Sequence, residues 1–334
     1  MPKPVTGMGS EAGPGEFELI ARYFAPLAGE GAFGLKDDAA LLVASSGNPI
    51  VVTQDAIAAG VHFLPDDPPD LIARKALRVN ISDLIAKGSH PFAYSLALGL
   101  PSNIAEDWIE RFARGLAEDQ AEYGVRLTGG DTYTSEQLTV SVAAFGEVKE
   151  GAYRSRLGAK AGDKIIVSGC FGDAAFGLLA LLGKLNGLQD SDLQTLVHAY
   201  HLPKPPFGVQ SAIARFANAA MDVSDGLIGD LEKLCAASNI SARIDLDQVP
   251  LSHAVQSPIK SNPAHKYLPF TGGDDYQVLL SVPAIQIDKL LATARDANVL
   301  MTIVGEVFDS NELSVFTYEN DERVHLTETS FAHF

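Results

Sequence analysis

Short acidic segments recur along the chain, each beside an apolar stretch. They read GLKDDAALL (34–42), VVTQDAI (51–57), VNISDLI (79–85), LTGGDTY (127–133), MDVSDGL (221–227) and FTGGDDYQ (270–277). Two carboxylates about 4 Å apart repel each other by about 1 kcal/mol in water, and by several times that at the effective dielectric of a protein surface. If several of these segments converge, their aspartates must therefore be protonated or must bind cations.

The donor atoms of these segments indicate which cation they would bind. They are the oxygens of Asp, Ser and Thr, with no cysteine and one candidate histidine, His62. Such hard oxygen ligands favour magnesium or calcium over zinc or copper, and magnesium is typically shared between carboxylates and substrate phosphates. The adjoining glycines allow the backbone to approach a ligand closely. The pattern therefore predicts phosphate chemistry at a magnesium site.

Single segments also have ordinary structural interpretations. In MDVSDGL, Asp and Ser both cap helices well, and we expect Asp225 to begin a helix while its carboxylate and that of Asp222 face a metal. The pair Asp37 and Asp38 alone would suit a turn. Asp83 falls inside a helical pattern on the side of its apolar stripe, where Asp is a poor helix former and needs a partner. The number of such segments favours the functional interpretation.

Two further features suit phosphate groups. Arg154 and Arg156 offer guanidinium groups near a predicted domain boundary. The segment GCFGDAAFG (169–177) resembles a phosphate-binding loop at a helix N-terminus, although it lacks the Gly-Lys-Ser/Thr ending of a Walker A motif. Neither a Rossmann fingerprint nor a nucleophile elbow is present.

Alternating strands and helices must position these segments. Hydrophobic patterns predict strands at 49–56, 94–101, 137–148, 164–169, 242–246, 276–282 and 299–307. They predict helices at 17–27, 69–89, 103–124, 173–185, 208–219, 226–238 and 284–297. For the helix at 103–124, Asn103 is the expected N-cap and Gly124 follows the end. We therefore expect an α/β (α+β) fold, with two α/β sandwich domains whose mixed sheets are flanked by helices.

Length and composition agree with this organisation. The 334 residues suit two domains, and the polar, glycine-rich stretch 149–163 is the expected boundary. We assign 1–15 to a flexible tail, 16–149 to an N-terminal domain and 150–334 to a C-terminal domain. A formal net charge of −17 argues against nucleic acid or membrane partners. Two distant cysteines, and the lack of a signal peptide or spanning segment, predict a cytoplasmic protein.

The six segments, in this order and at these spacings, resemble the thiamine-monophosphate kinases of the AIR synthetase-like superfamily. The resemblance extends from about residue 16 to the C-terminus. It implies ATP-dependent phosphorylation of thiamine monophosphate to thiamine diphosphate, by direct in-line transfer without a covalent nucleophile. It also implies several magnesium ions and a homodimer formed through the N-terminal domain. Another ATP-using enzyme of the superfamily, or a non-catalytic magnesium–nucleotide scaffold, remains an alternative.

The resemblance also implies roles for individual residues. The implied metal ligands are Asp38, Thr53, Gln54, Asp55, Asp83, Asp131, Asp222 and Asp225. The implied ATP-binding residues are Gly130, Asp131, Arg156 and Ser224. The implied thiamine-binding residues are His62, Asp274 and Phe331. Asp274 is a departure, because the family usually has Glu at this position, and Gln54 stands where Ser or Thr is common.

Overall fold

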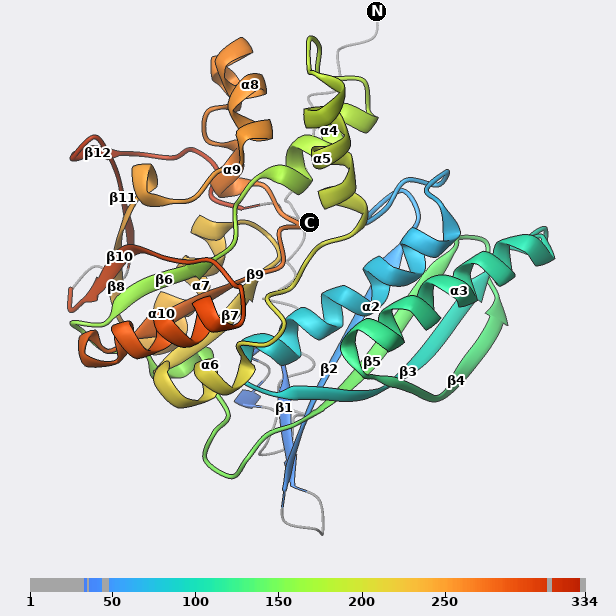
Figure 1. Ribbon diagram of the computed structural model, residues 1–334, viewed down its shortest axis with the longest axis horizontal. Coiled ribbons are helices and arrows are strands. Elements are labelled where there is room, and N and C mark those ends of the chain that lie inside the picture. Colours follow the sequence, from blue (N-terminus) through green and yellow to red (C-terminus); the bar gives the residue numbers. More distant parts are fainter. Residues whose placement is uncertain (1–32, 35, 44–47, 311–313, 331–334) are drawn as a thin grey trace, which may run out of the picture.

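The computed structural model describes residues 33–34, 36–43, 48–310 and 314–330 (Figure 1). The predicted helix at 17–27 and Phe331 lie outside these residues. Within them the strands form two mixed sheets, a five-stranded sheet in the order β1-β2-β5-β3-β4 and a seven-stranded sheet in the order β12-β11-β8-β10-β6-β9-β7. The chain completes the first sheet before it begins the second.

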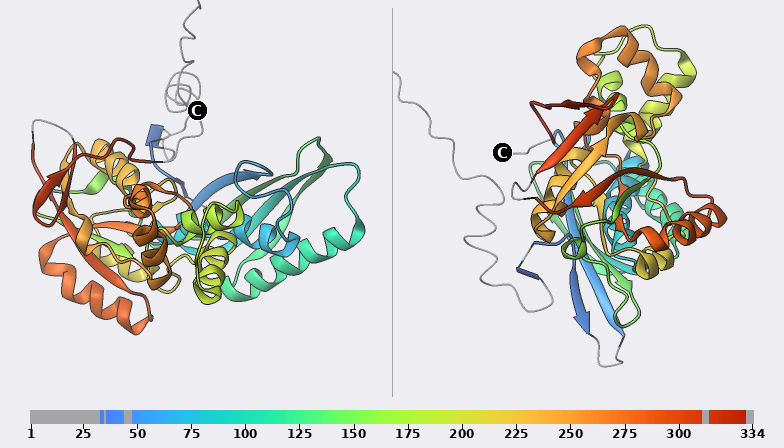
Figure 2. Two further views of the ribbon diagram at one scale, coloured as in Figure 1. Left: turned by 90° about the horizontal axis from the view of Figure 1, so that it is seen from above. Right: turned by 90° about the vertical axis from the view of Figure 1, so that its left-hand side faces the viewer.

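The first sheet has helices on one face. Its strands are β1 (Ala40–Val43), β2 (Pro49–Ala58), β3 (His90–Leu100), β4 (Arg126–Thr134) and β5 (Thr139–Glu147). Only β3 and β4 pair in parallel; the other neighbours are antiparallel. The helices α2 (Pro69–Ala86) and α3 (Glu106–Tyr123) lie along this face, and no helix of the described chain packs on the other (Figure 2).

The second sheet is covered on both faces. Its strands are β6 (Lys164–Ser168), β7 (Ala219–Val223), β8 (Ser241–Asp245), β9 (Gln277–Val282), β10 (Met301–Phe308), β11 (Val315–Glu319) and β12 (Glu322–Val324). The accompanying helices are α4 (Asp173–Leu181), α5 (Asp190–His201), α6 (Gln210–Phe216), α7 (Leu227–Ser238), α8 (His253–Ser261), α9 (Leu268–Thr271) and α10 (Ile287–Asp296). One hydrophobic core joins the sheet to α7, and another joins it to α6, α10 and α2.

Helix α2 therefore lies between the two sheets. It packs on β2, β3 and β5 of the first sheet and also contacts β7 and β9 of the second. Its buried residues include polar ones, among them Lys75, Arg78, Asn80 and Asp83. Buried polar side chains require partners, so this helix is the natural place for a polar site. Neither α2 nor any other helix of the described chain is long and apolar enough to cross a membrane.

Most predicted elements are present, with shifted ends, but two acidic segments differ from expectation. LTGGDTY was expected as a loop and lies within the edge strand β4. Its glycines are needed there, because Gly130 has φ 153° and a Cβ on it would lie 1.7 Å from the carbonyl oxygen of Leu96. The first residues of MDVSDGL belong to strand β7. Elements β1, β4, α5, β7, α8, α9, β11 and β12 were not predicted.

The helix expected at 103–124 has a different start from the predicted one. Helix α3 begins at Glu106 with Ala105 as N-cap, so the predicted N-cap Asn103 is wrong. Its end agrees with prediction, because Gly124 is the C-cap and has the left-handed φ of 71° that suits glycine.

Candidate active site

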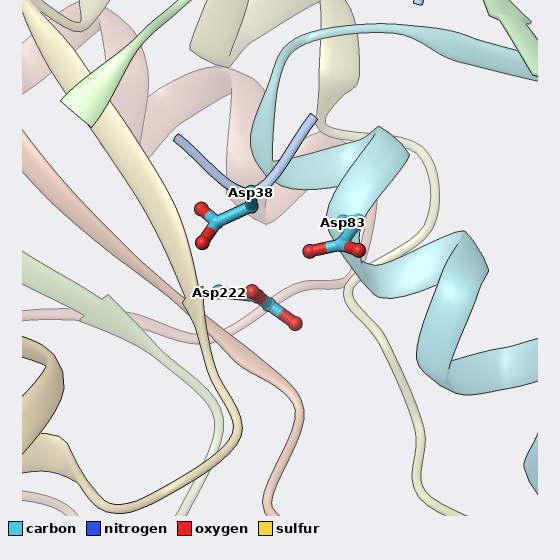
Figure 3. Close-up of side chains that lie close together, drawn as sticks. All are labelled: Asp38, Asp83 and Asp222. Carbon is cyan, nitrogen blue, oxygen red and sulfur yellow. The ribbon is translucent and has the colours of Figure 1, made fainter. Parts of the chain in front are cut away.

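Three carboxylates from separate parts of the chain converge where the two sheets meet. Asp38 precedes β1, Asp83 lies in α2, and Asp222 lies in β7. Each offers an oxygen atom, and these atoms all lie within 4.8 Å of one another (Figure 3). Asp83 and Asp222 are buried, whereas Asp38 is partly exposed. An all-carboxylate set of this size fits a hard divalent cation such as Mg²⁺.

The surroundings of these acids disfavour their bare charged forms. Burial, together with repulsion from Asp222 and Asp55, raises the pKa of Asp83 well above its usual value. Burial raises the pKa of Asp222 to about 6, against the lowering effect of a hydrogen bond from Ser82. The pKa of Asp55 is also raised to about 6. The surrounding protein desolvates its carboxylate, although the side chain keeps some access to solvent, and Asp225 repels its charge. A cation at this cluster would relieve the repulsion.

Strand β2 adds two predicted residues to the cluster. The hydroxyl of Thr53 donates to the carboxylate of Asp83, and its Oγ1 lies 3.2 Å from the carbonyl oxygen of Asp38. Asp55 is held by its backbone N–H, which donates to Oδ1 of Asn80 at 3.0 Å. Side chains alternate along a strand, so Gln54 points to the opposite face, where its Nε2 donates to Oγ of Ser141 at 3.1 Å.

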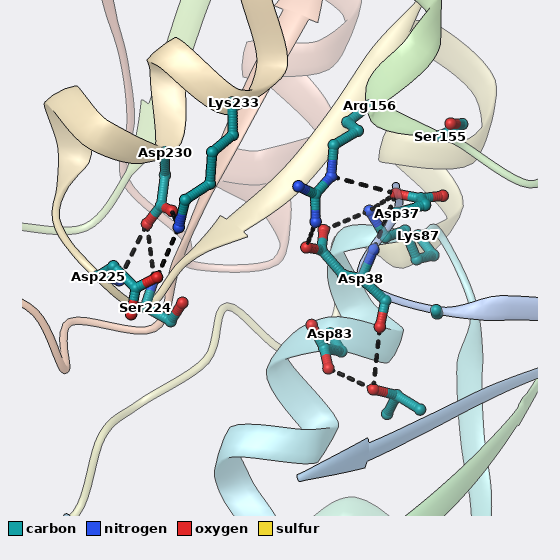
Figure 4. A network of polar contacts seen from close by, with 12 residues as sticks. Asp37, Asp38, Asp83, Lys87, Ser155, Arg156, Ser224, Asp225, Asp230 and Lys233 are labelled. Carbon is teal, nitrogen blue, oxygen red and sulfur yellow. Dashed lines mark hydrogen bonds and ion pairs between the residues drawn. The ribbon is translucent and has the colours of Figure 1, made fainter. Parts of the chain in front are cut away.

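Basic side chains already pair with the acids of this cluster (Figure 4). Arg156, in the segment between the two sheets, contacts the carboxylate of Asp38, and its Nε lies 3.6 Å from Oδ1 of Asp37. The Nζ of Lys87 lies 2.8 Å from Asp37 and 2.6 Å from Asp38. Arg156 was predicted to bind ATP; here it pairs with a predicted metal ligand.

The MDVSDGL segment does not cap its helix as expected. Helix α7 has Gly226 as N-cap, which offers no side chain, so the prediction that Asp225 begins the helix is wrong. Instead Oδ2 of Asp230 accepts from the N–H groups of Ser224 and Asp225, both at 3.0 Å. The Nζ of Lys233 then lies 2.5 Å from Asp225 and 2.8 Å from Asp230. The segment is thus held from within α7, and Asp222 is left to face the cluster.

A pocket of about 220 Å³ adjoins the acidic loop. Its polar lining includes His62, Ser224, Asp225 and Asp274. Leu178 and Leu179 of α4 contribute to its apolar wall. Two predicted thiamine-binding residues, His62 and Asp274, and two residues of MDVSDGL therefore surround one cavity with an apolar wall and an acidic edge.

Lys75 fixes two of the predicted thiamine-binding residues, His62 and Asp274, and was not found from the sequence. Its Nζ lies 2.8 Å from Oδ2 of Asp274 and 3.0 Å from the carbonyl oxygen of His62, and 4.0 Å from the ring centroid of Tyr200. Its spacing gave little indication, because Lys75 precedes Asp83 by eight residues of α2, which places it about 80° around the helix from Asp83.

Asp131 and Gly130 do not join the cluster within one chain. Asp55 is opposite Val142 of β5, which is opposite Leu96 of β3, which in turn is beside Gly130 of β4. Three strand spacings separate these positions, or about 14 Å. Asp131 is the next residue and therefore points to the open face of the sheet, away from Asp55.

Both halves of the chain match known protein families. The N-terminal domain of the AIR synthase related proteins matches residues 36–148, and their C-terminal domain matches residues 160–317. The chain is 40% identical to the thiamine-monophosphate kinase of Caulobacter vibrioides over 311 residues, which is 91% of this chain and 87% of that protein. It is 36% identical to the Escherichia coli K12 protein of the same name over 323 residues, covering 96% and 98% of the two chains.

Solved structures agree with these sequence matches. A structure described as AaThiL complexed with AMPPCP and TMP superposes with a TM-score of 0.82 at 29% identity, over 96% of this chain and 97% of that one. The thiamine-monophosphate kinase of Stenotrophomonas maltophilia K279a superposes with a TM-score of 0.76 at 35% identity, over 90% and 94% of the chains. The chain therefore belongs to the AIR synthase related family and, within it, to the thiamine-monophosphate kinases.

Proposed function

We propose that the protein is an ATP- and Mg²⁺-dependent kinase that phosphorylates thiamine monophosphate to thiamine diphosphate, in the cytoplasm. The observation that carries the proposal is the convergence of Asp38, Asp83 and Asp222 beside the pocket that contains His62 and Asp274. The names of the relatives supply the substrate, and the structure described with AMPPCP and TMP supports ATP as the phosphoryl donor.

The chain's own residues would bring two anionic substrates together. Asp38, Asp83 and Asp222 would hold Mg²⁺, which neutralises phosphate oxygens when it is bound. Lys75 orients Asp274 and His62 at the pocket, where the apolar wall of α4 would exclude water from the thiamine rings. Direct in-line transfer then requires alignment of the acceptor phosphate with the γ-phosphoryl group. The acceptor phosphate is already ionised near neutral pH, so a strong general base is not needed.

The direct test is formation of thiamine diphosphate from thiamine monophosphate, ATP and Mg²⁺ by the purified full-length protein. Aminoimidazole ribonucleotide precursors serve as control substrates, because they are the substrates of a sister enzyme. We expect product with thiamine monophosphate only, and none after chelation of divalent cations. Turnover of the control substrates, or no turnover of either, would contradict the proposal.

Filling the apolar wall of the pocket should weaken binding of the thiamine substrate alone. For Leu178→Trp we expect KM for thiamine monophosphate to rise about tenfold or more, as a bulkier side chain excludes the rings, while KM for ATP stays within about twofold. Steady-state kinetics with each substrate varied in turn measures the split. Leu182→Trp is the matched control, because Leu182 follows α4 and is 46% exposed outside the pocket. Equal changes in both KM values would contradict the assignment of the pocket.

We further propose that the open face of the first sheet binds a second copy of the chain. All of β4 is exposed in the single chain, and Tyr133, 48% exposed, projects from it near Asp131. A sheet face without a covering layer is typical of an interface, and most homodimers are symmetric. A second copy on this face would pack against Asp131 of β4, so the predicted roles of Gly130 and Asp131 would be carried out at this interface rather than at the acid cluster of their own chain.

Introducing a charge on this face should separate the copies. We expect Phe145→Glu, at a half-buried position on β5 beside Val52, to sediment as a monomer and to lose most activity, because each site would lack residues from the second copy. Sedimentation velocity and the kinase assay measure the two effects. Ile285→Glu is the control, since Ile285 is 82% exposed in the second half of the chain. A wild type that is monomeric and active would contradict the proposed dimer.

A further inference from the structure

Lys87 is a fully buried lysine at the end of helix α2. Its side chain is 0% exposed, and burying an ammonium group is costly unless it is paired and hydrogen-bonded. All three of its N–H donors have partners: Oδ1 of Asp37 at 2.8 Å, Oδ2 of Asp38 at 2.6 Å and the carbonyl oxygen of Ala220 at 3.0 Å. The two carboxylates, both within 2.8 Å of the Nζ, stabilise its charged form despite the burial. The group therefore remains charged.

These contacts reach every segment that supplies a carboxylate to the cluster. Asp38 is bound directly, and Ala220 is two residues before Asp222 on strand β7. Asp83 lies one helical turn before Lys87, whose backbone N–H donates to the carbonyl oxygen of Asp83 at 3.1 Å. The position of Lys87 is thus coupled to the spacing of Asp38, Asp83 and Asp222.

Lys87 differs from the other cation at Asp38. Arg156 contacts Oδ1 of Asp38 from the segment between the sheets and keeps 12% of its side chain exposed. Lys87 contacts Oδ2 from the interior and has no route to solvent. Asp37, whose side chain is also sealed from solvent, and the hydroxyl of Tyr153 that donates to it complete the inner side of this pairing. A substrate phosphate could reach Arg156, but not Lys87.

We infer that Lys87 is a positioning residue whose ammonium group is a permanent positive charge within the acid cluster. It holds Asp38 and β7 where the three carboxylates converge, and it supplies one positive charge that a divalent cation would otherwise have to bring. The inference rests on the proposed Mg²⁺-dependent function, and it predicts that the Mg²⁺ response of the folded protein depends on the charge of the Lys87–Asp37 pair.

Two variants, one that removes a positive charge and one that removes a negative charge, test the inference. The Tm of the full chain is measured in metal-free buffer and across an Mg²⁺ titration. Lys87→Met keeps an unbranched chain and removes the positive charge. We expect its metal-free Tm to fall, the Mg²⁺-induced rise in Tm to exceed that of wild type, and half-maximal stabilisation to need about fivefold less Mg²⁺. Asp37→Asn removes a neighbouring negative charge, and we expect it to need about fivefold more.

The direction in which each variant changes the Mg²⁺ concentration for half-maximal stabilisation distinguishes an effect of charge from an effect of packing. A purely structural role for the pair would lower Tm equally with and without Mg²⁺, or would move both variants in the same direction, and either result overturns the inference. If Lys87→Met does not fold, the shift in Asp37→Asn still decides. Lys164→Met, at a surface pair with Glu306, should leave the Mg²⁺ response unchanged. Absence of any Mg²⁺ requirement in wild-type activity would instead count against the proposed function.

Discussion

Replacing Asp83 by Asn should reduce kcat by about 10²- to 10³-fold while the protein remains folded. Asp83 lies at the centre of the cluster, where Thr53 donates to its carboxylate and Asp38 and Asp222 offer oxygens within 4.8 Å. Asparagine has nearly the same shape but carries no charge, so the fold is kept while the proposed Mg²⁺ site loses one anionic ligand. We expect the Mg²⁺-induced rise in Tm to shrink together with kcat.

The same variant should be more stable than wild type when no metal is present. Because the pKa of Asp83 is higher in the folded than in the unfolded chain, its ionised form disfavours folding near pH 7.5. As the pH falls below 4, the usual pKa of Asp, wild-type Asp83 becomes protonated in both the folded and the unfolded chain, and the advantage of the variant should vanish. Thermal unfolding in chelator at several pH values measures this difference.

A buried aspartate outside the cluster provides the matched control. The carboxylate of Asp163 accepts from Oγ of Ser281 at 2.6 Å and from Nδ2 of Asn218 at 2.9 Å, and it is buried in the second half of the chain. Asp163→Asn should lower Tm and leave kcat and the Mg²⁺ response of the folded protein unchanged. Near-normal kcat in Asp83→Asn would refute the assignment of the cluster.

The sequence was sufficient to find the acids but not to place all of them. Asp83 stood out because an acid within an apolar helical stripe needs a partner, and the structure provides Thr53. Asp131 gave no such indication of its position, since Gly-Gly-Asp suits a turn as well as a strand. Asp131 lies in strand β4 because only a glycine at the preceding position, Gly130, fits against the backbone of Leu96. This contact joins segments far apart in the chain.

The basic residues of the site were harder to predict, for a different physical reason. Lysines on a helix are usually solvated, and the pattern of α2 suggested one buried stripe with a polar face. The second sheet covers that polar face, so Lys75 and Lys87 are buried against acids contributed by other segments. Asp230 was missed similarly, because a side chain inside α7 replaced the expected N-cap. Such pairings depend on tertiary packing and cannot be derived from local spacing alone.

Removing the carboxylate of Asp119 should strongly lower the free energy of unfolding. Asp119 of α3 is 0% exposed; its Oδ2 lies 2.7 Å from Nε of Arg78, and its Oδ1 lies 2.7 Å from Nε of Arg74. Arg78 is itself buried in α2 and donates to the carbonyl oxygen of Pro203, so the pair connects α3 through α2 to the second half of the chain. Loss of one partner leaves a buried guanidinium with reduced compensation.

We expect Asp119→Ala to lower the free energy of unfolding by about 3 kcal/mol. This value is at the low end for a broken buried pair, because Glu122 still lies 2.7 Å from Nη2 of Arg78. Asp70→Ala is a closely matched control: Asp70 pairs with Arg111 between the same two helices, but the side chains are 26% and 45% exposed. Its loss should cost about 1 kcal/mol or less, since exposed pairs contribute little. Urea unfolding of both variants measures the difference, and equal losses would show that burial does not determine the strength of these two contacts between α2 and α3.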